Sequence, residues 1–389
     1  QMCIRDRFSG EWNKYTINDL ATVVGGGTPD TTVKSYWGGD IQWFTPSEIG
    51  KNKYVDFSKR TITRDGLDNS SAKLLPLHTI LLSSRATVGE CSIASNECTT
   101  NQGFQSLIAK QCNIDFLYYL IQTKKKDLIR NACGSTFLEI SANEIRKIKV
   151  AVPVQNEQEQ IAKLLSLIDE RIATQNKIIE DLKKLKSAIS KYLFARKDLL
   201  ETTICLSNIA TLKNGYAFQS GKYNALGKWK ILTITNVPGE RYINDEDCNC
   251  IINLPNDIQD HQVLKEGDIL ISLTGNVGRV SLCKNGNYLL NQRVGLLQLA
   301  KNVNQEFLYQ ILSSQRFENS MIACGQGAAQ MNIGKGDVEN YVLPYSSNGN
   351  NILFAAKILH SYDECIINEL RRLTLLTMQK QYLLTQMFI

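Results

Sequence analysis

The chain has 389 residues, of which 43% are hydrophobic and 21% charged, and it carries a net charge of +6. This length exceeds one ordinary hydrophobic core and predicts two domains of about 150 residues each. The composition is typical of a soluble globular protein, and no run of about 18 apolar residues predicts a membrane span. The mild excess of positive charge is compatible with a polyanionic partner without being diagnostic of one.

Eleven cysteines and three histidines (His78, His261 and His360) are scattered along the chain. The cysteines form no C-x-x-C pair, and the histidines lie in separate segments, so a zinc site is not expected. An odd number of cysteines without a secretory signal indicates reduced thiols and a cytoplasmic protein.

The sequence contains one long internal repeat, at an offset of 189 to 194 residues. This offset is far longer than the 20–50 residues or so of solenoid repeats, and it indicates a duplicated domain plus a connector. The matching segments include Leu20–Thr22 with Ile209–Thr211, Val88-Gly89 with Val277-Gly278, Asn101-Gln102 with Asn291-Gln292, Phe116–Tyr118 with Phe307–Tyr309, and Ala132–Gly134 with Ala323–Gly325.

Each copy begins with a module of mixed secondary structure. Short apolar runs bounded by turn residues, such as Thr79–Ser83 and Asp268–Leu273, predict short strands. Gly38–Asp40 predicts a turn or an irregular loop. A helix is expected from Asp115 to Asn131, with a counterpart from Gln305 to Ile322. Each module is therefore predicted to be α+β.

The composition changes after Pro153. From Gln155 to Arg196 the chain has no glycine or proline and is rich in strong helix formers. Apolar residues recur there at alternating spacings of four and three, the pattern of a coiled-coil seam, with Gln175 and Lys186 as polar members. The apolar seam residues are Ile161, Leu165, Ile168, Ile172, Ile179, Leu182, Ile189 and Leu193.

The same seam returns at the end of the chain, at an offset of 194, with Glu369 and Lys380 as the polar members. A heptad seam needs a partner helix, and a pseudo-twofold duplication predicts that the two helices pair antiparallel. About 40 residues at 1.5 Å each give a rod of roughly 60 Å. The second apolar seam comprises Ala355, Leu359, Tyr362, Ile366, Leu373, Leu376, Leu383 and Met387.

A search for catalytic motifs gives a negative result. The sequence has no G-x-x-x-x-G-K-[ST] phosphate loop, no Rossmann fingerprint, no nucleophile elbow and no Asn-Pro-Pro-aromatic motif. Asp181-Leu182-Lys183 is the only acid-x-Lys triplet, and within the predicted coiled coil it is better interpreted as a solvated helix face. We therefore expect no catalytic residue, metal or cofactor on this chain.

Loops in both modules offer the side chains that read nucleic acids. Arginine pairs with guanine, Asn or Gln with adenine, and Ser or Thr with several bases, while basic side chains bind phosphates. For each residue taken alone, a solvated loop or a turn-stabilising hydrogen bond is the favoured interpretation, and Asn101 and Asn291 are also compatible with capping a turn. The DNA-binding candidates are Thr28, Lys34, Tyr36, Trp37, Thr45, Ser47, Arg85, Thr87, Tyr216, Gln219, Lys222, Thr235, Asn236, Thr274, Asn276 and Arg279, with Arg293 and Gln330 added because they flank repeated motifs.

With these features in order along the chain, residues 12 to 389 closely resemble the specificity subunit of type I restriction–modification systems. No single motif is decisive, but their order and the duplication are. The strings that carry the resemblance are Gly26–Pro29 (GGTP), Tyr36–Trp43 (YWGGDIQW), Thr45–Ser47 (TPS), Pro153–Gln158 (PVQNEQ), Asn214–Ser220 (NGYAFQS), Gly267–Ser272 (GDILIS), Gly275–Gly278 (GNVG) and Ala329–Ile333 (AQMNI).

The resemblance implies an architecture. It implies two duplicated α/β target-recognition domains, at 8–154 and 198–348, separated by a pseudo-twofold antiparallel two-helix coiled coil formed by helices at 155–197 and 349–389. The start of the second helix departs from the family pattern, because Pro344–Gly349 lacks the Glu-Gln pair found at Glu157-Gln158. The contacts of that pair are therefore expected to differ in the second copy.

The resemblance also implies a function. Each domain would read one half of a split, asymmetric double-stranded DNA target through the major groove, and the coiled coil would set the spacer. The subunit itself would be non-catalytic. Two modification subunits would bind S-adenosylmethionine and methylate adenine, and restriction subunits using ATP and Mg²⁺ would translocate and cleave DNA. No membrane partner is expected.

Two alternatives stay open at this point. A protein-binding coiled-coil scaffold would show the same helices, and salt-dependent affinity for duplex DNA would distinguish it from a DNA reader. An orphan or phase-variable specificity subunit would share the whole sequence pattern, and its neighbouring genes would identify it.

Overall fold

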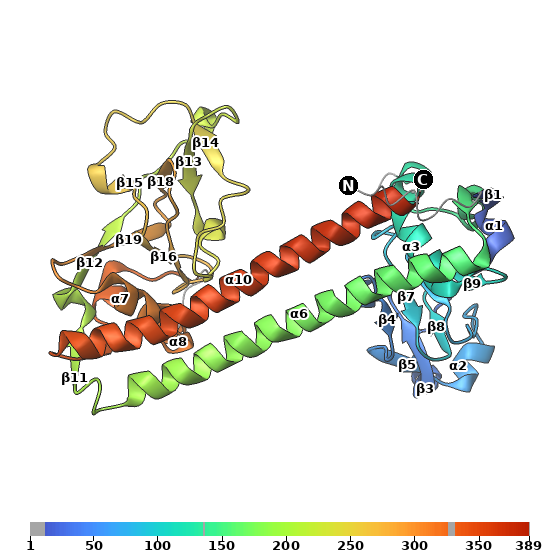
Figure 1. Ribbon diagram of the computed structural model, residues 1–389, viewed down its shortest axis with the longest axis horizontal. Helices are drawn as coiled ribbons and strands as arrows, with labels where there is room; N and C mark the ends of the chain where they lie inside the picture. The colour runs from blue at the N-terminus through green and yellow to red at the C-terminus, as the bar shows by residue number, and fades with distance from the viewer. Residues whose placement is uncertain (1–11, 135–136, 326–330, 389) are drawn as a thin grey trace. The chain divides into compact units, whose positions relative to one another are not determined.

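The computed structural model describes residues 12–134, 137–325 and 331–388, and the chain divides into two compact units (Figure 1). Unit 1 comprises Gln1–Asn176 and Arg372–Ile389, and unit 2 comprises Lys177–Arg371. Two long helices, α6 (Gln155–Ala195) and α10 (Gly349–Met387), contribute one segment to each unit. Each unit therefore consists of one module and the helix segments that belong to it.

Strands and short helices alternate in unit 1. Its strands are β1 (Asn13–Thr16), β2 (Ala21–Gly25), β3 (Trp37–Phe44), β4 (Tyr54–Val55), β5 (Arg60–Ile62), β6 (Ile80–Leu82), β7 (Cys91–Ala94), β8 (Cys98–Thr100), β9 (Gln105–Ala109) and β10 (Lys149–Val152). Its short helices are α1 (Ile17–Leu20), α2 (Arg64–Asp68), α3 (Ile114–Thr123), α4 (Lys125–Arg130) and α5 (Ala142–Lys147), with 3-10 turns η2 (Lys34–Tyr36) and η3 (Pro46–Glu48).

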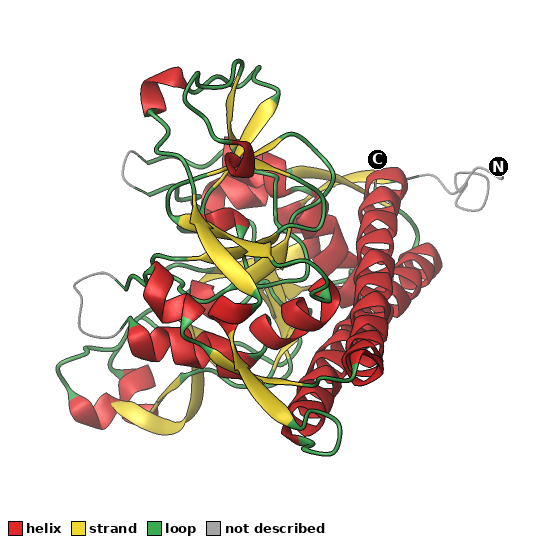
Figure 2. Cartoon of the chain, turned by 90° about the vertical axis from the view of Figure 1, so that its left-hand side faces the viewer, coloured by secondary structure: helices red, strands yellow, loops and turns green. Residues whose placement is uncertain are grey.

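Unit 2 also combines short strands with short helices (Figure 2). Its strands are β11 (Thr202–Cys205), β12 (Ala210–Asn214), β13 (Trp229–Leu232), β14 (Asn249–Ile251), β15 (Val263–Leu264), β16 (Ile269–Ser272), β17 (Val280–Leu282), β18 (Tyr288–Leu290), β19 (Val294–Leu299) and β20 (Val342–Tyr345). Its short helices are α7 (Gln305–Leu312), α8 (Gln315–Cys324) and α9 (Lys335–Glu339), with 3-10 turns η4 (Leu206–Asn208), η5 (Ser220–Lys222), η6 (Ile234–Asn236) and η7 (Asp260–Gln262).

The sheets of the two units share a common topology, to which unit 1 adds the edge strand β4 and unit 2 the edge strand β15. In unit 1 the strand orders are β2-β9-β6-β7-β4 and β5-β3-β8, and in unit 2 they are β12-β19-β16-β17 and β14-β13-β18-β15. Equivalent pairs run parallel in both units, β3 with β8 and β13 with β18. A ribbon of the module's first and last strands, β1-β10 and β11-β20, precedes each long helix. The predicted duplication of an α/β domain is confirmed.

The central strand of the first sheet in unit 1, β6, is an uninterrupted apolar run, without alternation of apolar and polar residues. Ile80, Leu81 and Leu82 of β6 are all inaccessible to solvent, because the strand is covered on both faces. Ile80 and Leu82 pack in the cluster that includes α3 and the start of α6, whereas Leu81 packs with Phe44 and Phe104. The equivalent strand β16 divides its side chains in the same way between two clusters. Each module thus has layers of helices, a first sheet and a second sheet.

The two long helices pair antiparallel within each unit (Figure 1). In unit 1 the start of α6 packs on the end of α10, where Ile161 and Leu165 share a core with Leu383 and Met387. In unit 2 the end of α6 packs on the start of α10, with Leu193 in one core with Ala355 and Leu359. None of the predicted apolar seam residues is fully exposed, and Ile172, Leu182, Ile189, Tyr362, Leu373 and Leu376 are the half-buried ones.

Two expectations for the modules were wrong. Gly38–Asp40 lies inside β3, where the register shifts between Trp37 and Ile41 and Gly38 adopts a φ of 83°, so the glycines form a bulge within a strand. The single helix expected from Asp115 to Asn131 is divided at Lys124 into α3 and α4.

The counterpart helix in unit 2 is divided as well. Between α7 and α8, the Ser314 hydroxyl accepts a hydrogen bond from the backbone N–H of Phe317 and caps the start of α8. Serine at this position favours a new helix start over continuation, because its side chain satisfies an otherwise unpaired backbone donor.

The departure at the start of the second long helix has a structural counterpart. In unit 1, Gln158 accepts a hydrogen bond from the Asn113 backbone N–H at 3.0 Å and donates one to the Pro153 carbonyl at 2.9 Å. The equivalent position in α10 is Ile352, which is buried in the core of unit 2. There the chain before α10 is held instead by Glu201, which accepts hydrogen bonds from the backbone N–H and hydroxyl of Ser347 at 2.7 and 2.9 Å.

Two further observations concern the described residues alone. None of their helices combines the length and the apolar character needed to cross a membrane. Their cysteines, from Cys91 to Cys365, are all free thiols.

Candidate nucleic-acid interface

The ends of several strands meet at one edge of unit 1. The backbone N–H of Gly27, after β2, donates to the Thr100 carbonyl at 2.8 Å, and that of Asn101 donates to the Phe44 carbonyl at the end of β3 at 3.1 Å. The backbone N–H of Ser84, after β6, donates to the Gly103 carbonyl at 2.8 Å. We call residues 26–28, 45–48, 84–87 and 101–103 the polar edge of unit 1.

Unit 2 builds the same edge from equivalent segments. The backbone N–H of Tyr216 donates to the Leu290 carbonyl at 2.8 Å, and that of Leu273 donates to the Arg293 carbonyl at 3.0 Å. The backbone N–H of Asn291 lies 3.2 Å from the carbonyl oxygen of Leu232 at the end of β13. Residues 214–216, 233–236, 273–276 and 291–293 form the polar edge of unit 2.

Local side-chain hydrogen bonds fix the turns of both edges. The Asn101 side-chain oxygen accepts from the Gly103 N–H at 2.9 Å, and that of Asn291 accepts from the Arg293 N–H at 3.2 Å. The turn-capping interpretation of the repeated asparagines is therefore confirmed. A second pair of caps follows the middle strands, where Thr45 bonds to Glu48 and Thr233 bonds to Asn236.

Glycine is required where the first loop of each module crosses the turn after β8 or β18. A Cβ on Gly26 would overlap the Asn101 carbonyl oxygen, and a Cβ on Gly215 would overlap that of Asn291. The two positions are equivalent in the repeat, at an offset of 189. Close backbone contact therefore explains both glycines without any positive φ angle.

The loop after the central strand has the same conformation in both units. Ala86 has a φ of 63° and the equivalent Gly275 a φ of 74°, both in the left-handed region. Each loop is joined to the segment before the last short helix by an isolated bridge, Arg85 with Glu139 and Thr274 with Asn332. The loops therefore present their side chains from a fixed backbone.

In unit 1, five candidates lie on the polar edge. Ser47, Arg85 and Thr87 are exposed, and the Arg85 guanidinium lies 3.8 Å from the Glu139 carboxylate. Thr28 and Thr45 are half-buried, with hydroxyls bonded to Gln102 and to Glu48 respectively. The exposed side chains can meet a ligand directly, whereas the two half-buried threonines support the edge.

The other three candidates of unit 1 lie against β5 and α2. The Tyr36 carbonyl accepts a hydrogen bond from the Thr63 N–H at 2.9 Å, and the Arg60 guanidinium stacks 3.6 Å from the centre of the Trp37 ring. Lys34 is exposed on η2, which contacts α2. Lys34, Tyr36 and Trp37 therefore lie outside the segments that form the polar edge of unit 1.

In unit 2, Thr235, Asn276 and Arg293 are exposed on the polar edge. Thr274 donates to the Asn332 side chain at 3.0 Å, and Tyr216 donates to the Asp257 carboxylate at 2.7 Å. That hydrogen bond raises the pKa of Tyr216. Thr274 and Tyr216 are both half-buried and already hydrogen-bonded within the protein, so only part of each side chain is accessible to a ligand.

The remaining candidates of unit 2 have other surroundings. Gln219 and Lys222 are exposed around η5, away from the hydrogen bonds that define the edge, and Gln330 lies outside the described residues. The half-buried Arg279 lies 3.5 Å from Glu318. In unit 1, Glu90 occupies the position of Arg279 and forms an ion pair with Lys125.

Asn236 must be removed from the base-reading candidates. Its side chain is only 4% exposed. The oxygen accepts from the backbone N–H and hydroxyl of Thr233, and the amide donates to the Asn244 carbonyl at 2.9 Å. Its polar atoms are thus engaged within the protein. This burial could not be predicted from the sequence, because an Asn in a loop is the same residue type whether it caps a turn or faces a ligand.

Two exposed residues at the edges were missing from the candidates, Gln102 and Gln292. Both follow the turn-capping asparagines, and amide side chains of this kind pair with adenine in the major groove. The signal that could have identified them was the repeated Asn-Gln pair. The edges combine hydroxyl, amide and guanidinium groups. Within the described residues, no cluster of three His, Cys, Asp or Glu side chains could hold a metal ion.

Comparison with known proteins gives a consistent result. A family model described as the type I restriction modification DNA specificity domain matches twice, at residues 9–184 and 201–377. The specificity subunit of the type I restriction enzyme MjaIX from Methanocaldococcus jannaschii is 38% identical over 192 residues, which cover 47% of this chain and 44% of that protein. The EcoR124I/EcoR124II specificity subunit from Escherichia coli is 28% identical over 199 residues, 49% of this chain and 48% of that protein.

Both sequence alignments therefore span about half the length of the relatives. A solved structure, the S subunit of a type I restriction-modification system from M. genitalium, aligns over 98% of this chain and 96% of its own, with a TM-score of 0.58 and 18% identity. At this level of identity the structural match supports the fold, including two modules and two long helices.

Proposed function

The chain belongs to the type I restriction modification DNA specificity family, and from this premise we propose that it is the subunit that selects the DNA sequence for a type I restriction–modification complex. Each unit reads one half of a bipartite, asymmetric target. The observation that carries this function is the pair of polar edges, built from equivalent segments at equivalent places in the two units. Two similar but non-identical reading surfaces fit a target with two different halves.

The exposed side chains of the edges have the chemistry needed for base reading. Arg85 and Arg293 can pair with guanine, Gln102 and Gln292 with adenine, and Asn276 with adenine as well. Ser47, Thr87 and Thr235 can bind bases or phosphates. The two edges differ in the residues at equivalent positions, Arg85 against Thr274 and Thr87 against Asn276. Different donors and acceptors at equivalent positions would select different half-sites.

The paired helices supply the remaining requirement of a bipartite reader. α6 and α10 each contribute to both units, so they set the length of the unread spacer between the half-sites. A continuous helix is suited to this role because its length is fixed at about 1.5 Å per residue. We place the protein in the cytoplasm together with its DNA.

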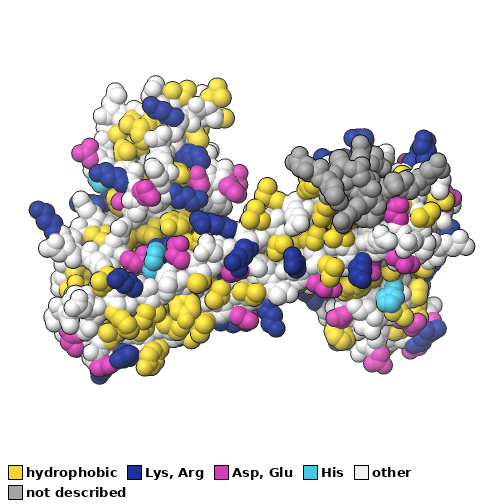
Figure 3. Space-filling model, viewed as in Figure 1, with side chains coloured by type: hydrophobic (Ala, Val, Ile, Leu, Met, Phe, Trp, Pro, Cys, Tyr) yellow, Lys and Arg dark blue, Asp and Glu magenta, His cyan; other side chains and the backbone are white. Residues whose placement is uncertain are grey.

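The long helices also provide a docking surface for two modification subunits. α6 exposes the apolar side chains of Leu164, Leu167, Ile178, Leu185 and Tyr192, at separations that keep them on one side of the helix. Figure 3 shows apolar side chains gathered along the surface formed by the long helices. A contiguous exposed apolar surface is typical of an interaction site. S-adenosylmethionine binds the modification subunits, and ATP and Mg²⁺ serve the restriction subunits, so the chain itself is non-catalytic.

Binding to duplex DNA at increasing salt tests the function. We expect the complex of this chain with its modification subunits to lose affinity as salt rises, with log K falling by about 0.9 per phosphate contact for each unit of log salt concentration. This follows because phosphate contacts release condensed counterions. A complex that forms but does not bind duplex DNA would contradict the function and favour a protein scaffold.

A further inference from the structure

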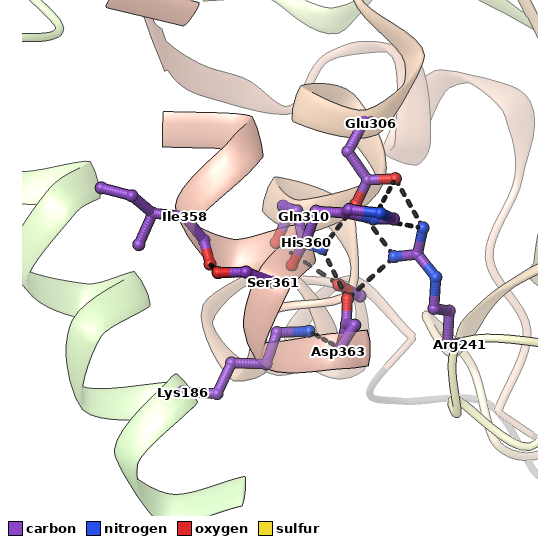
Figure 4. A network of polar contacts seen from close by, with 9 residues as sticks. Lys186, Arg241, Glu306, Gln310, Ile358, His360, Ser361 and Asp363 are labelled. Carbon is purple, nitrogen blue, oxygen red and sulfur yellow. Dashed lines mark hydrogen bonds and ion pairs between the residues drawn. The ribbon is translucent and has the colours of Figure 1, made fainter. Parts of the chain in front are cut away.

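A buried polar junction in unit 2 joins four segments of the chain (Figure 4). Asp363 of α10 is only 6% exposed and accepts three hydrogen bonds. The donors are Lys186 Nζ on α6 at 2.5 Å, Arg241 Nη1 from the segment between β13 and β14 at 2.9 Å, and Gln310 Nε2 on α7 at 2.6 Å. One carboxylate therefore connects both long helices to the module.

The module side of this junction is itself ordered by charge. The second terminal nitrogen of Arg241 donates to Glu306 at 2.7 Å and lies 3.0 Å from the His360 ring nitrogen. Burial opposes ionisation of Glu306, but hydrogen bonds from Arg241 and Gln310 outweigh it and lower the pKa of this carboxyl below its ordinary 4.5. The Arg241 guanidinium thus lies between Glu306 of the module and Asp363 of α10.

Unit 1 contains a related junction that also joins both long helices to the module, although its module cation contacts a different residue of the helix. Asp169 of α6 accepts a hydrogen bond from Lys380 Nζ on α10 at 2.7 Å and another from the Tyr119 hydroxyl on α3 at 2.6 Å. The module cation is Lys53, which pairs with Asp115 at 2.7 Å and donates to Ser166 of α6 at 2.6 Å. Burial and the bond to Asp169 raise the pKa of Tyr119, which therefore donates as a neutral hydroxyl.

The two junctions are related by the internal repeat. The helix residues correspond at an offset of 194, the residues of α3 and α7 at 191, and the module cations at 188. Strand pairing supports the last match, because Tyr54 pairs in parallel with Ile93 and Tyr242 pairs in parallel with Leu282. The equivalent pairs are Asp169 with Asp363, Lys380 with Lys186, Asp115 with Glu306, Tyr119 with Gln310, and Lys53 with Arg241.

The buried ion pairs of the junction are suited to holding the module in one position on the helices. Buried ion pairs add little net stability compared with apolar residues of similar size, but a buried charge that loses its partner is costly. A shift of the module along or around the helices would leave Asp363 or Arg241 without its partners. Tyr119 in unit 1 corresponds to Gln310 in unit 2, and each donates a hydrogen bond to the aspartate of its own junction. The connection between module and helix is therefore kept although the side chain changes.

We propose that Asp169 and Asp363 are positioning residues, each of which fixes its own module on the paired helices and thereby sets how that module meets its half of the DNA target. This role rests on the proposed function. Loss of either carboxylate should impair the reading of one half-site and leave the other intact. A residue that merely stabilised the whole chain would affect both halves alike.

The test uses the full chain in complex with its modification subunits and a library of random-sequence DNA duplexes. Bound duplexes are sequenced, and the enrichment at each position of the selected motif is compared between variants. Asp363→Asn is expected to lower enrichment about tenfold in one segment of the motif, since an uncompensated charge is left at the junction. Asp169→Asn is expected to lower it in the other segment. Asp181→Asn, the same change at an exposed position of α6, serves as the control.

A second measurement covers the case in which a variant is poorly folded. Lys186→Gln removes only the α6 donor and is expected to lower enrichment in the same segment as Asp363→Asn, with faster amide hydrogen exchange in α7 and unchanged exchange in α3. Equal losses in both segments, or none in either, would overturn the role of these aspartates. A parent complex that selects no motif would overturn the proposed function, and with it this inference.

Discussion

Replacing Leu359 by aspartate is expected to destabilise unit 2 by about 3–5 kcal/mol, the range for an unpaired charge left in a protein interior. Leu359 is inaccessible to solvent and lies in the core where α10 meets both α6 and the module. The introduced carboxylate would lie among the apolar side chains of that core. Thermal unfolding of the chain, followed by circular dichroism, measures the effect.

The control for this variant is the same substitution at Leu353, on the same helix. Leu353 is 40% exposed, so an aspartate there remains hydrated. It also lies near the start of α10, where a negative charge is favoured by the helix dipole. The Leu353→Asp chain should unfold within a few degrees of the parent. Equal destabilisation by both changes would contradict the assignment of Leu359 to the buried seam.

The substitution Gly215→Ala is expected to disrupt the polar edge of unit 2. The added Cβ would overlap the carbonyl oxygen of Asn291, and backbone cannot move aside as the end of a flexible side chain can. Overpacking typically costs about 1–3 kcal/mol, and occasionally more. Because the displaced turn includes Arg293, we also expect weaker DNA binding by the complex. Thermal unfolding and duplex affinity are the two measurements.

Gly221→Ala is the matched control, since no atom of the described residues lies within 4 Å of the Cβ it would add. Gly26→Ala should reproduce the effect of Gly215→Ala at the equivalent edge of unit 1. A Gly215→Ala chain with parental unfolding and DNA affinity would show that the first loop does not cross the β18–β19 turn as closely as the structure describes.

The duplication and the helices could be predicted because they rest on local and periodic signals. The apolar residues at heptad spacing identified the seam, the common offset of 194 identified its repeat, and the pseudo-twofold duplication predicted an antiparallel pair. The polar seam members Lys186 and Lys380 were recognised as well. Their partners were not, because Asp363 and Asp169 lie beside the seam and their modules supply the other contacts through loops and helices far apart in the sequence.

The candidate DNA-binding residues were harder to predict than the fold. Arg85, Thr87, Asn276 and Arg293 are exposed on the edges, as a DNA-binding role requires. Asn236 has the same chemistry but is buried in a cap, and Trp37 lies beneath Arg60. A single sequence does not distinguish these cases, because exposure depends on strand ends that tertiary hydrogen bonds bring together. The bulge at Gly38–Asp40 and the break at Lys124 were also not predicted.

The most direct test of the central claim is methylation-aware sequencing of DNA from cells that produce this chain together with the modification subunit of its own system. Two reading units joined by paired helices predict methyladenine at one motif, composed of two defined segments separated by a spacer of constant length and undefined sequence. Methylation of a continuous motif, or a complex that forms without any new methylation, would contradict that claim.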